Sequence, residues 1–319
     1  ALRRDRSSSA SRSVQSPMCP MCPMSHLDRY ALRGEVRAAA ARLADAGVAS
    51  PENDARLLAE HLLGGPLLLA DGADSDFPSA YRLLVVRRAA REPLQHILGV
   101  MWFRGLELAS RPGVFIVRPE TEVVAGAAIE AAQRMTDDGA PLVVDLCAGS
   151  GAIAAAVAHE VPGARLVAVE IDETAVALAR ENCERLAPGR VEVVRGDAAD
   201  PRVLHELDGR VDVVVSNPPY VPAGALEDVE TQRYDPEAAL FGGGEDGLAV
   251  PRAVVGRAAA LLRPGGVLVM EHDAGQGRAL RETALAAGFE AALTGQDLTG
   301  RDRYLRAVRA SGAPGSDRP

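Results

Sequence analysis

The feature of this sequence that most constrains its fold is an alternation, after residue 118, of short apolar segments with longer segments of helical pattern. The apolar segments are rich in Val and Leu, which is typical of buried β-strands. Strands that alternate with helices predict a parallel sheet, because each parallel strand needs a crossover connection to reach the next. We therefore expect a doubly wound α/β domain with strands at Leu142–Leu146, Arg165–Glu170, Val191–Val194, Val211–Ser216 and Gly266–Glu271.

The N-terminal part of the chain has different patterns. Residues 1–25 are rich in Ser, Arg and Pro without an apolar period, and we expect them to form a disordered leader. Residues 26–92 have apolar residues at helical spacing, interrupted at Gly47 and Gly64, and predict a small domain of three helices. The third of these helices is expected at Ser79–Ala90.

A short linker is expected between the two domains. The runs Gln95–Leu98 and Leu106–Ala109 lie beside glycines and have β-like composition, so residues 93–117 are expected to form a β-hairpin. The α/β domain then covers residues 118–309, and residues 310–319 are expected to be a disordered tail.

The composition excludes several classes of function. The formal net charge of −9 argues against a broad duplex-binding surface. The chain contains no Lys, which excludes Schiff-base chemistry, pyridoxal phosphate attachment and the P-loop lysine. No apolar run reaches the roughly 20 residues that span a bilayer, so we expect a soluble protein. Four Cys without a signal peptide favour the reducing cytoplasm.

A metal site is not expected. Cys19 and Cys22 have a spacing that occurs in zinc sites, but only His26 lies close to them in the sequence. Because a structural zinc ion has four protein ligands, we predict no metal ion.

A glycine-rich segment follows the first predicted strand of the α/β domain and begins a helix. It spans Asp145 to Ala154, and its turn consists of Cys147, Ala148, Gly149, Ser150 and Gly151. Glycines at such a turn let the backbone approach a ligand, and the helix N-terminus offers free N–H groups. The pattern is shared by several nucleotide-binding folds.

Acidic residues end or follow the first three strands. Glu170 ends the second strand, where it can accept hydrogen bonds from both ribose hydroxyls, and Asp197 follows the third, where it can accept from an adenine amino group. Asp145, four residues before Gly149, would repel a pyrophosphate and would suit a cationic ammonium group. S-Adenosylmethionine has a sulfonium, an ammonium and an adenosine group, and fits this set better than NAD does.

The fourth predicted strand is followed by Asn217, Pro218, Pro219 and Tyr220, which lie where such a sheet delivers residues to the ligand crevice. The Asn217 side-chain carbonyl and the Pro218 backbone carbonyl are two acceptors that can hold both hydrogens of a planar NH₂ group. Accepting both N–H bonds favours charge on nitrogen as a C–N bond forms, mainly in the transition state. Tyr220 can stack on the planar group. The element therefore predicts methyl transfer to an amide or aromatic amino group.

With these motifs, the chain resembles the protein-(glutamine-N5) methyltransferases that act on peptide-chain release factors, the HemK type. The resemblance runs from about residue 28 to residue 309. Beside the glycine-rich turn and the Asn-Pro-Pro-Tyr element, it includes residues 54–61, 93–99, 118–122, 239–248 and 297–303.

The resemblance implies a class I, Rossmann-like, seven-stranded methyltransferase domain with a small N-terminal helical domain, and we expect the last two strands to be antiparallel. It implies that the cofactor S-adenosylmethionine contacts Asp145, residues 147–151, Glu170, Asn217 and the pair Asp197 and Ala198. Asn217 to Tyr220 would hold the substrate glutamine. In this family that glutamine belongs to a Gly-Gly-Gln tip that enters the ribosomal peptidyl-transferase centre, and the helical domain helps to hold the release factor.

The resemblance also bears on partners and location. We expect a cytoplasmic monomer that acts in translation termination, binds release factors, and contacts neither a membrane nor nucleic acid directly.

The chain departs from the family pattern at a few positions. Cys147 and Ala148 stand where Gly and Thr are usual, Val117 replaces a Pro and Asp235 replaces a Glu. Ala198 stands where some members have an aromatic residue. None of these changes removes a donor or acceptor used above. Related paralogues carry a similar Cys in this turn, so a glutamine in another protein stays open as the substrate.

Two further interpretations remain open from the residues alone. The Asn-Pro-Pro-Tyr element is shared with methyltransferases of adenine or guanine amino groups, whose binding to nucleic acid would be sensitive to salt. A catalytically silent scaffold would bind no S-adenosylmethionine, and the intact glycine-rich turn and Glu170 argue against it.

Overall fold

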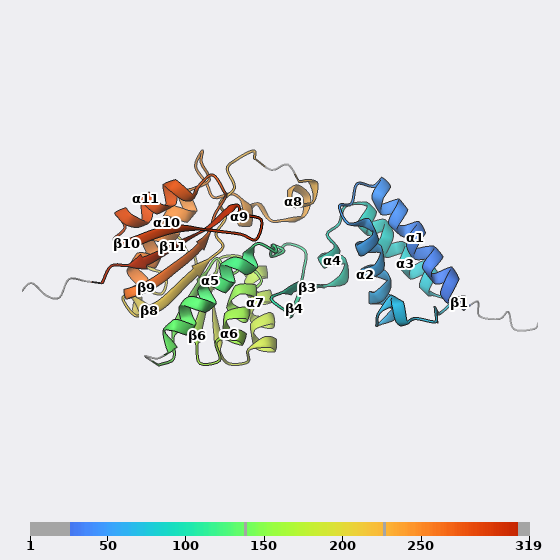
Figure 1. Ribbon diagram of the computed structural model, residues 1–319, viewed down its shortest axis with the longest axis horizontal. Coiled ribbons are helices and arrows are strands. Elements are labelled where there is room, and N and C mark those ends of the chain that lie inside the picture. The colour runs from blue at the N-terminus through green and yellow to red at the C-terminus, as the bar shows by residue number, and fades with distance from the viewer. Residues whose placement is uncertain (1–25, 137–138, 226–227, 312–319) are drawn as a thin grey trace, which may run out of the picture.

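The computed structural model of the protein describes residues 26–136, 139–225 and 228–311. A small helical unit and a larger α/β unit follow one another along the chain (Figure 1). The predicted leader and nearly all of the predicted tail lie outside the described residues, as do Cys19 and Cys22.

The helical unit has its own apolar core. It consists of α1 (Arg29–Asp45), α2 (Pro51–Leu63) and α3 (Phe77–Ala89), with the short elements β1 (Leu27–Asp28), η1 (Leu67–Leu69) and β2 (Gly72–Ala73). Residues at helical spacing in all three helices meet in one buried cluster, among them Leu32, Leu58 and Tyr81. The predicted helical region is confirmed, and α3 begins two residues earlier than expected because Pro78 is accepted in its first turn.

The prediction for residues 95–98 is wrong. These residues belong to the helix α4 (Leu94–Leu98), and the hairpin consists of β3 (Val100–Phe103) and β4 (Leu106–Ala109). The amides of His96 and Ile97 both donate to the Pro93 carbonyl, and Gly99 ends the turn in a left-handed conformation. A short apolar run fits a helix turn or a strand equally well, so periodicity alone did not separate them.

The α/β unit contains one seven-stranded sheet. Its strands are β5 (Leu142–Leu146), β6 (Arg165–Glu170), β7 (Val191–Arg195), β8 (Val211–Ser216), β9 (Leu262–Glu271), β10 (Phe289–Gln296) and β11 (Asp302–Arg309). The order across the sheet is β10-β11-β9-β8-β5-β6-β7. Strands β5 to β9 are parallel, and β11 is antiparallel to both of its neighbours. This confirms the predicted fold class and the antiparallel last pair.

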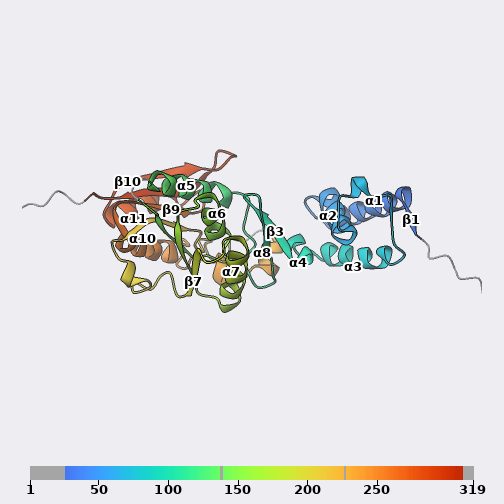
Figure 2. The same ribbon diagram turned by 90° about the horizontal axis from the view of Figure 1, so that it is seen from below.

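Helices cover both faces of the sheet (Figure 2). The helices of the α/β unit are α5 (Thr121–Arg134), α6 (Ala152–Glu160), α7 (Glu173–Leu186), α8 (Val229–Tyr234), α9 (Glu237–Leu240), α10 (Ala249–Leu261) and α11 (Gly277–Ala286), with the short η3 (His205–Leu207); α8 lies away from the sheet, toward the helical unit (Figure 1). Alternate residues of β8 enter opposite cores: Val213 and Val215 pack with α5 and α6, whereas Val214 packs with α10 and α11. Both faces of the strand are therefore buried, as its continuous Val run predicted.

The strand order places the ends of β5 and β8 at the point where the chain reverses its direction across the sheet. From β5 the chain proceeds outward to β6 and β7, and it then returns to β8 on the other side of β5. Ligands of doubly wound folds bind outside the carboxyl ends of strands at such a point.

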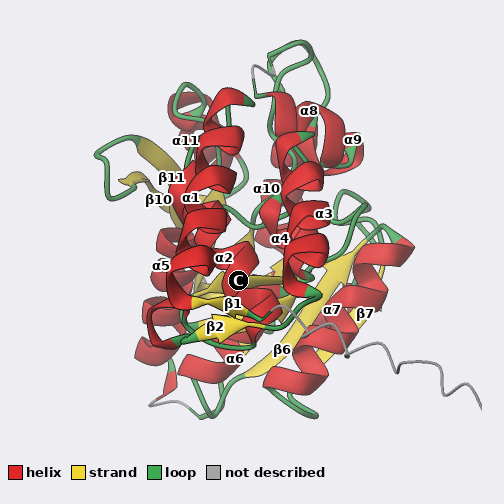
Figure 3. Ribbon diagram, turned by 90° about the vertical axis from the view of Figure 1, so that its right-hand side faces the viewer, coloured by secondary structure: helices red, strands yellow, loops and turns green. Residues whose placement is uncertain are grey.

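Figure 3, viewed from the side of the helical unit, shows α1, α2 and α3 in front of the sheet. None of the helices in the described residues is long and apolar enough to cross a membrane. Nor do the described residues contain a cluster of His, Cys, Asp or Glu side chains arranged to hold a metal ion.

Candidate active site

A cavity of about 310 Å³ lies at the carboxyl ends of the central strands. Seven of the residues singled out from the sequence line it, namely Cys147, Gly149, Glu170, Asp197, Ala198, Asn217 and Pro219. Four others, Asp145, Ala148, Ser150 and Gly151, lie behind its wall, where each is largely or completely buried. The folded chain thus brings together loops that follow four different strands.

The turn after β5 is held tightly against α7. Gly149 and Gly151 both have positive φ, at 55° and 79°. A Cβ on Gly151 would lie 3.0 Å from the Cys183 sulfur and 3.2 Å from Ala179 Cα, whereas a Cβ on Gly149 would meet no atom within 4 Å. Gly151 is therefore required for packing, and Gly149 leaves room at the wall of the cavity.

Asp145 is completely buried beneath this turn. Its Oδ2 accepts a hydrogen bond from the Ala154 amide at 3.1 Å, and its Oδ1 has no partner in the described part of the chain. Burial and, to a smaller extent, the charge of Glu170 raise the pKa of Asp145 to about 8, against the opposing effect of the hydrogen bond from Ala154. A buried carboxyl oxygen without a partner next to a cavity favours a cationic or hydrogen-bond-donating ligand group.

Glu170, at the end of β6, accepts hydrogen bonds from the backbone of the same turn and of the loop that follows β6. Its Oε2 accepts from the Gly149 amide at 2.8 Å, and its Oε1 accepts from the amides of Ile171 and Asp172 at 2.8 and 2.9 Å. A carboxylate has about four acceptor positions, so one remains for a ligand hydroxyl. The sequence predicted that Glu170 would accept both ribose hydroxyls, and these backbone contacts leave room for one.

The far end of the cavity lies at the loop after β7. Asp197 is exposed, and its Oδ1 accepts from the Ala199 amide at 2.8 Å, which leaves Oδ2 directed to other partners. Ala198 is buried in the wall, and Ile171 covers the cavity with a side chain that is 54% exposed. An apolar surface beside an exposed carboxylate suits a flat, amino-bearing ring.

Cys147 is not a nucleophile in this site. Burial raises the pKa of its thiol, and the neighbouring charge of Glu170 raises it further, so the thiol stays neutral at physiological pH. The residue adopts a φ of 64°, a left-handed conformation that costs a non-glycine residue on the order of 1 kcal/mol. The family's usual Gly at this position has no such cost.

The Asn217 side chain makes one hydrogen bond to another described residue. Its Nδ2 donates to the Thr121 hydroxyl at 3.3 Å, which leaves the side-chain carbonyl facing other partners. Neither Asn217 Oδ1 nor the backbone carbonyl of Pro218 accepts a hydrogen bond from another described residue. Asn217 lines the cavity, whereas Pro218 is buried and is not among its lining residues, so the binding of an NH₂ group by the two acceptors stays a prediction.

The rest of the Asn-Pro-Pro-Tyr element is held by three contacts. The Tyr220 hydroxyl donates to Glu271 Oε1 at 3.0 Å, and the Tyr220 carbonyl accepts from Gln276 Nε2 at 2.8 Å. A Cβ on Gly247 would lie 2.4 Å from that carbonyl oxygen, so the loop before α10 packs directly against the backbone of the element. These contacts come from residues far away in the sequence and keep the element rigid.

Several site residues were not predicted. Phe115 and Pro236 line the cavity, and the Arg118 guanidinium lies 4.9 Å from the centre of the Phe115 ring. Thr121 and Glu271 support the Asn-Pro-Pro-Tyr element from α5 and β9. Glu271 was within reach of sequence reasoning, because it ends the fifth predicted strand at the same edge of the sheet as Glu170.

The chain matches known proteins over most of its length. The family described as PrmC N-terminal domain matches residues 36–99, and the family described as Methyltransferase small domain matches residues 105–239. The Release factor glutamine methyltransferase of Bifidobacterium longum is 44% identical over 290 residues, which are 86% of this chain and 98% of that protein. The protein of the same name from Streptomyces coelicolor is 48% identical over 285 residues, 88% of this chain and 98% of that protein.

Among solved structures, the T. thermophilus 16S rRNA N2 G1207 methyltransferase is 26% identical and aligns with 66% of this chain and 49% of its own, at a TM-score of 0.46. The identity to the two relatives extends over nearly their whole length and over both units of this chain. The chain belongs to the family of release factor glutamine methyltransferases.

Proposed function

We propose that the protein transfers a methyl group from S-adenosylmethionine to the side-chain amide nitrogen of the glutamine in the Gly-Gly-Gln tip of peptide-chain release factors. The observation that carries this proposal is the pair of acceptors, Asn217 Oδ1 in the lining of the cavity and the carbonyl of the following Pro218, that accept from no other described residue. Family membership supports the same reaction.

The two acceptors match a primary amide. The hydrogen bond from Asn217 Nδ2 to Thr121 leaves the Asn217 side-chain carbonyl as the acceptor for the amide. With both N–H bonds accepted, the amide nitrogen becomes richer in electrons and more pyramidal as it attacks the methyl carbon. The methylated amide then loses a proton to water, so no general base is required.

The residues around the cavity fit S-adenosylmethionine, which supplies an electrophilic methyl group when it is bound. Asp145, with one buried oxygen that no described residue contacts, would stabilise the positive charge of the methionine part. Glu170 would accept from one ribose hydroxyl, and Asp197 would accept from the adenine amino group beside Ala198. Cys147, Gly149 and Asn217 would complete the wall around the sulfonium.

The helical unit and the α/β unit together would hold the release factor. A cleft of about 670 Å³ lies between them, lined by charged and polar side chains that include Asn53, Arg88, Arg118 and Glu230. We assign the substrate-recognition domain to residues 26–92, the linker to residues 93–117 and the methyltransferase domain to residues 118–309. The protein acts as a monomer in the cytoplasm in this proposal.

The test is the intact mass of a release factor after incubation with the protein and S-adenosylmethionine. The proposal expects a gain of one methyl group on the release factor and none on its variant with Gln→Ala at the tip. If both proteins gain the same mass, another residue is methylated. If neither gains mass while the enzyme binds S-adenosylmethionine, the substrate is a different molecule.

A further inference from the structure

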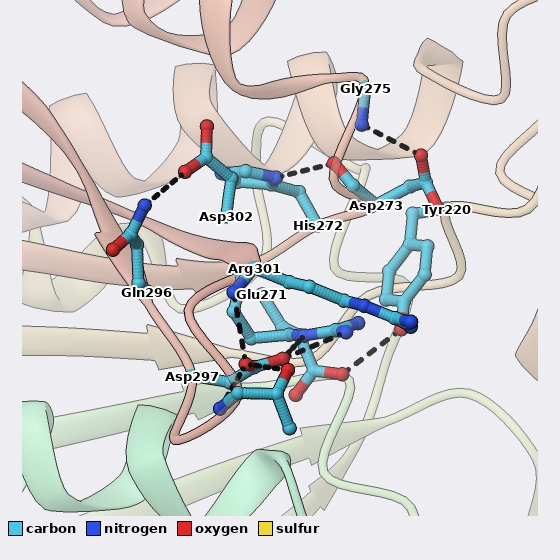
Figure 4. Close-up of polar contacts among 11 residues, drawn as sticks. Tyr220, Glu271, His272, Asp273, Gly275, Gln296, Asp297, Arg301 and Asp302 are labelled. Atoms are coloured by element: carbon cyan, nitrogen blue, oxygen red, sulfur yellow. Dashed lines mark hydrogen bonds and ion pairs between the residues drawn. The ribbon is translucent and has the colours of Figure 1, made fainter.

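Glu271 is a buried carboxylate at the end of β9 and lies directly behind the substrate-binding element. Its side chain points toward the Tyr220 hydroxyl (Figure 4), which donates to Oε1 at 3.0 Å. The residue is 1% exposed, and Oε2 has no partner of normal hydrogen-bond geometry in the described residues. Burial of a carboxylate with so few partners is costly, so a structural role alone gives little reason for it.

Thr121 connects Glu271 to Asn217. It is completely buried at the start of α5, and its hydroxyl oxygen accepts from Asn217 Nδ2. A hydroxyl that accepts one hydrogen bond still has a proton to donate. The Thr121 hydroxyl is near enough to Glu271 to lower the pKa of that carboxylate, although no hydrogen bond of normal geometry joins the two groups in the described residues.

One carboxylate therefore lies at the junction of two chains of contacts. The first leads to Tyr220, which would stack on the amide, and the second leads through Thr121 to Asn217, which would accept from the amide. The Tyr220 hydroxyl donates to Glu271, and the Thr121 hydroxyl beside it still has a proton to donate, so both chains use Glu271 as an acceptor.

We propose that Glu271 is a positioning residue for methyl transfer, which orients Tyr220 directly and the Asn217 side-chain amide through Thr121. This inference rests on the proposed function, since it concerns the same amide-binding group. Glu271 touches neither the substrate nor the reacting atoms in this role.

The protonation state of Glu271 controls this arrangement. Burial raises the pKa of Glu271 to about 7, Glu120 raises it as well, and Arg303 together with the hydroxyls of Thr121 and Tyr220 lowers it. The ionised form can accept from both hydroxyls, whereas the protonated form carries an O–H donor and has fewer acceptor positions, which weakens these contacts. The rate of methyl transfer should therefore rise as the pH increases through about 7.

The first test compares kcat for wild type and Glu271→Gln between about pH 6 and pH 9 at saturating S-adenosylmethionine. We expect the variant to lose roughly tenfold or more of kcat at about pH 8, with the KM for the release factor within about threefold of wild type. The rise of kcat near pH 7 should be absent from the variant. Asp212→Asn is the matched control, since Asp212 is a carboxylate of the neighbouring β8 at the opposite end of the strand.

Asp212 accepts from the Leu142 amide and pairs with Arg263, so its substitution removes a carboxylate from the sheet without touching the site. Its pH profile should equal that of wild type. A Glu271→Gln enzyme that keeps the wild-type kcat and pH profile would overturn the proposal. So would a variant that folds but no longer binds S-adenosylmethionine, because Glu271 would then support the whole site.

The second test needs no release factor. The side-chain NH₂ signal of Asn217 in an NMR spectrum, identified by its loss in Asn217→Ala, should shift with a midpoint near pH 7 in wild type. The shift should vanish in Glu271→Gln and also in Thr121→Val, which removes the connecting hydroxyl. A signal that does not respond to pH in wild type would contradict the proposal, whether or not release factors are methylated.

Discussion

At the scale of single residues, Asp145 is the group whose charge depends most on the ligand. It is completely buried, accepts one hydrogen bond and has a pKa raised by burial to about 8. Without a ligand it is therefore largely protonated at neutral pH. A cationic ligand favours the ionised form, so binding would release a proton.

This linkage predicts that affinity for S-adenosylmethionine rises between about pH 6 and pH 8. Below the pKa of Asp145, each unit by which the pH falls reduces the ionised fraction of Asp145 by up to about tenfold. The dissociation constant for S-adenosylmethionine should rise by the same factor. Asp145→Asn should bind more weakly and show a flat pH profile. Titration calorimetry in two buffers of different ionisation enthalpy measures both the affinity and the proton release. Equal slopes for the two proteins would refute the linkage.

Gly247 provides a second prediction at this scale. Its φ of 69° disfavours any other residue, and a Cβ on it would lie 2.4 Å from the Tyr220 carbonyl oxygen, so a side chain would force the substrate-binding element to move. Gly247→Ala should destabilise the protein by roughly 2–4 kcal/mol and reduce methyl transfer, as urea unfolding and initial rates would show.

The control for this substitution is Gly256→Ala in the middle of α10. A Cβ at Gly256 would meet no atom within 4 Å, so Ala should stabilise the helix by up to about 1 kcal/mol. If both variants unfold at the same urea concentration, the close approach at Gly247 has no energetic consequence.

At the scale of elements, α3 holds the helical unit and the α/β unit together through Arg88. This residue is 5% exposed and donates to Asp54 of α2 at 2.7 Å and to Glu230 of α8 at 3.0 Å. Arg91, which follows the end of α3, donates to the same Glu230 oxygen at 2.8 Å. Helix α8 follows the Asn-Pro-Pro-Tyr element, so these ion pairs connect the helical unit to the substrate site.

The two partners of Arg88 should differ in importance. Removal of Asp54 leaves a buried guanidinium without its closest partner, and Asp54→Ala should cost about 3–5 kcal/mol of unfolding free energy. Glu230 is partly exposed, so Glu230→Ala should cost about 1 kcal/mol. Urea unfolding of the two variants gives the comparison, and a larger loss for Glu230→Ala would contradict the assignment.

The elements themselves were predictable where a local pattern defines them. The five parallel strands and the glycine-rich turn lie where the apolar runs and glycines of the sequence indicated. Helix α4 was not recognised, because five residues are too few to show a helical period. The contacts of Thr121 with Asn217 and of Tyr220 with Glu271 join residues 96 and 51 positions apart, and no local pattern encodes such pairs.

The contacts of the candidate site were harder to predict from the sequence than its residue types. Asn217 was expected to offer an acceptor, and the structure shows which atom fixes its orientation. Asp145 was expected to face a cation from the loop, but it lies beneath the cavity wall. The burial of Asp145 depends on how α6 and α7 pack around the turn, and the sequence of the turn alone does not specify that packing.

At the scale of the whole molecule, the acidic charge bears on the choice of substrate. A net charge of −9 disfavours contact with a phosphate backbone. We expect no methyl transfer to adenine or guanine in DNA or RNA oligonucleotides and no salt-sensitive binding to them. The check is the incorporation of labelled methyl groups into the oligonucleotides at low salt. Label in the DNA or RNA would support a nucleic-acid methyltransferase instead.

The most direct test of the central claim is the single-turnover rate of methyl transfer by Asn217→Ala at saturating S-adenosylmethionine and release factor. Removal of one of the two amide acceptors should reduce this rate by about 100-fold or more, while the dissociation constant for S-adenosylmethionine changes by less than about fivefold. A rate within a few-fold of wild type would show that Asn217 does not hold the reacting amide.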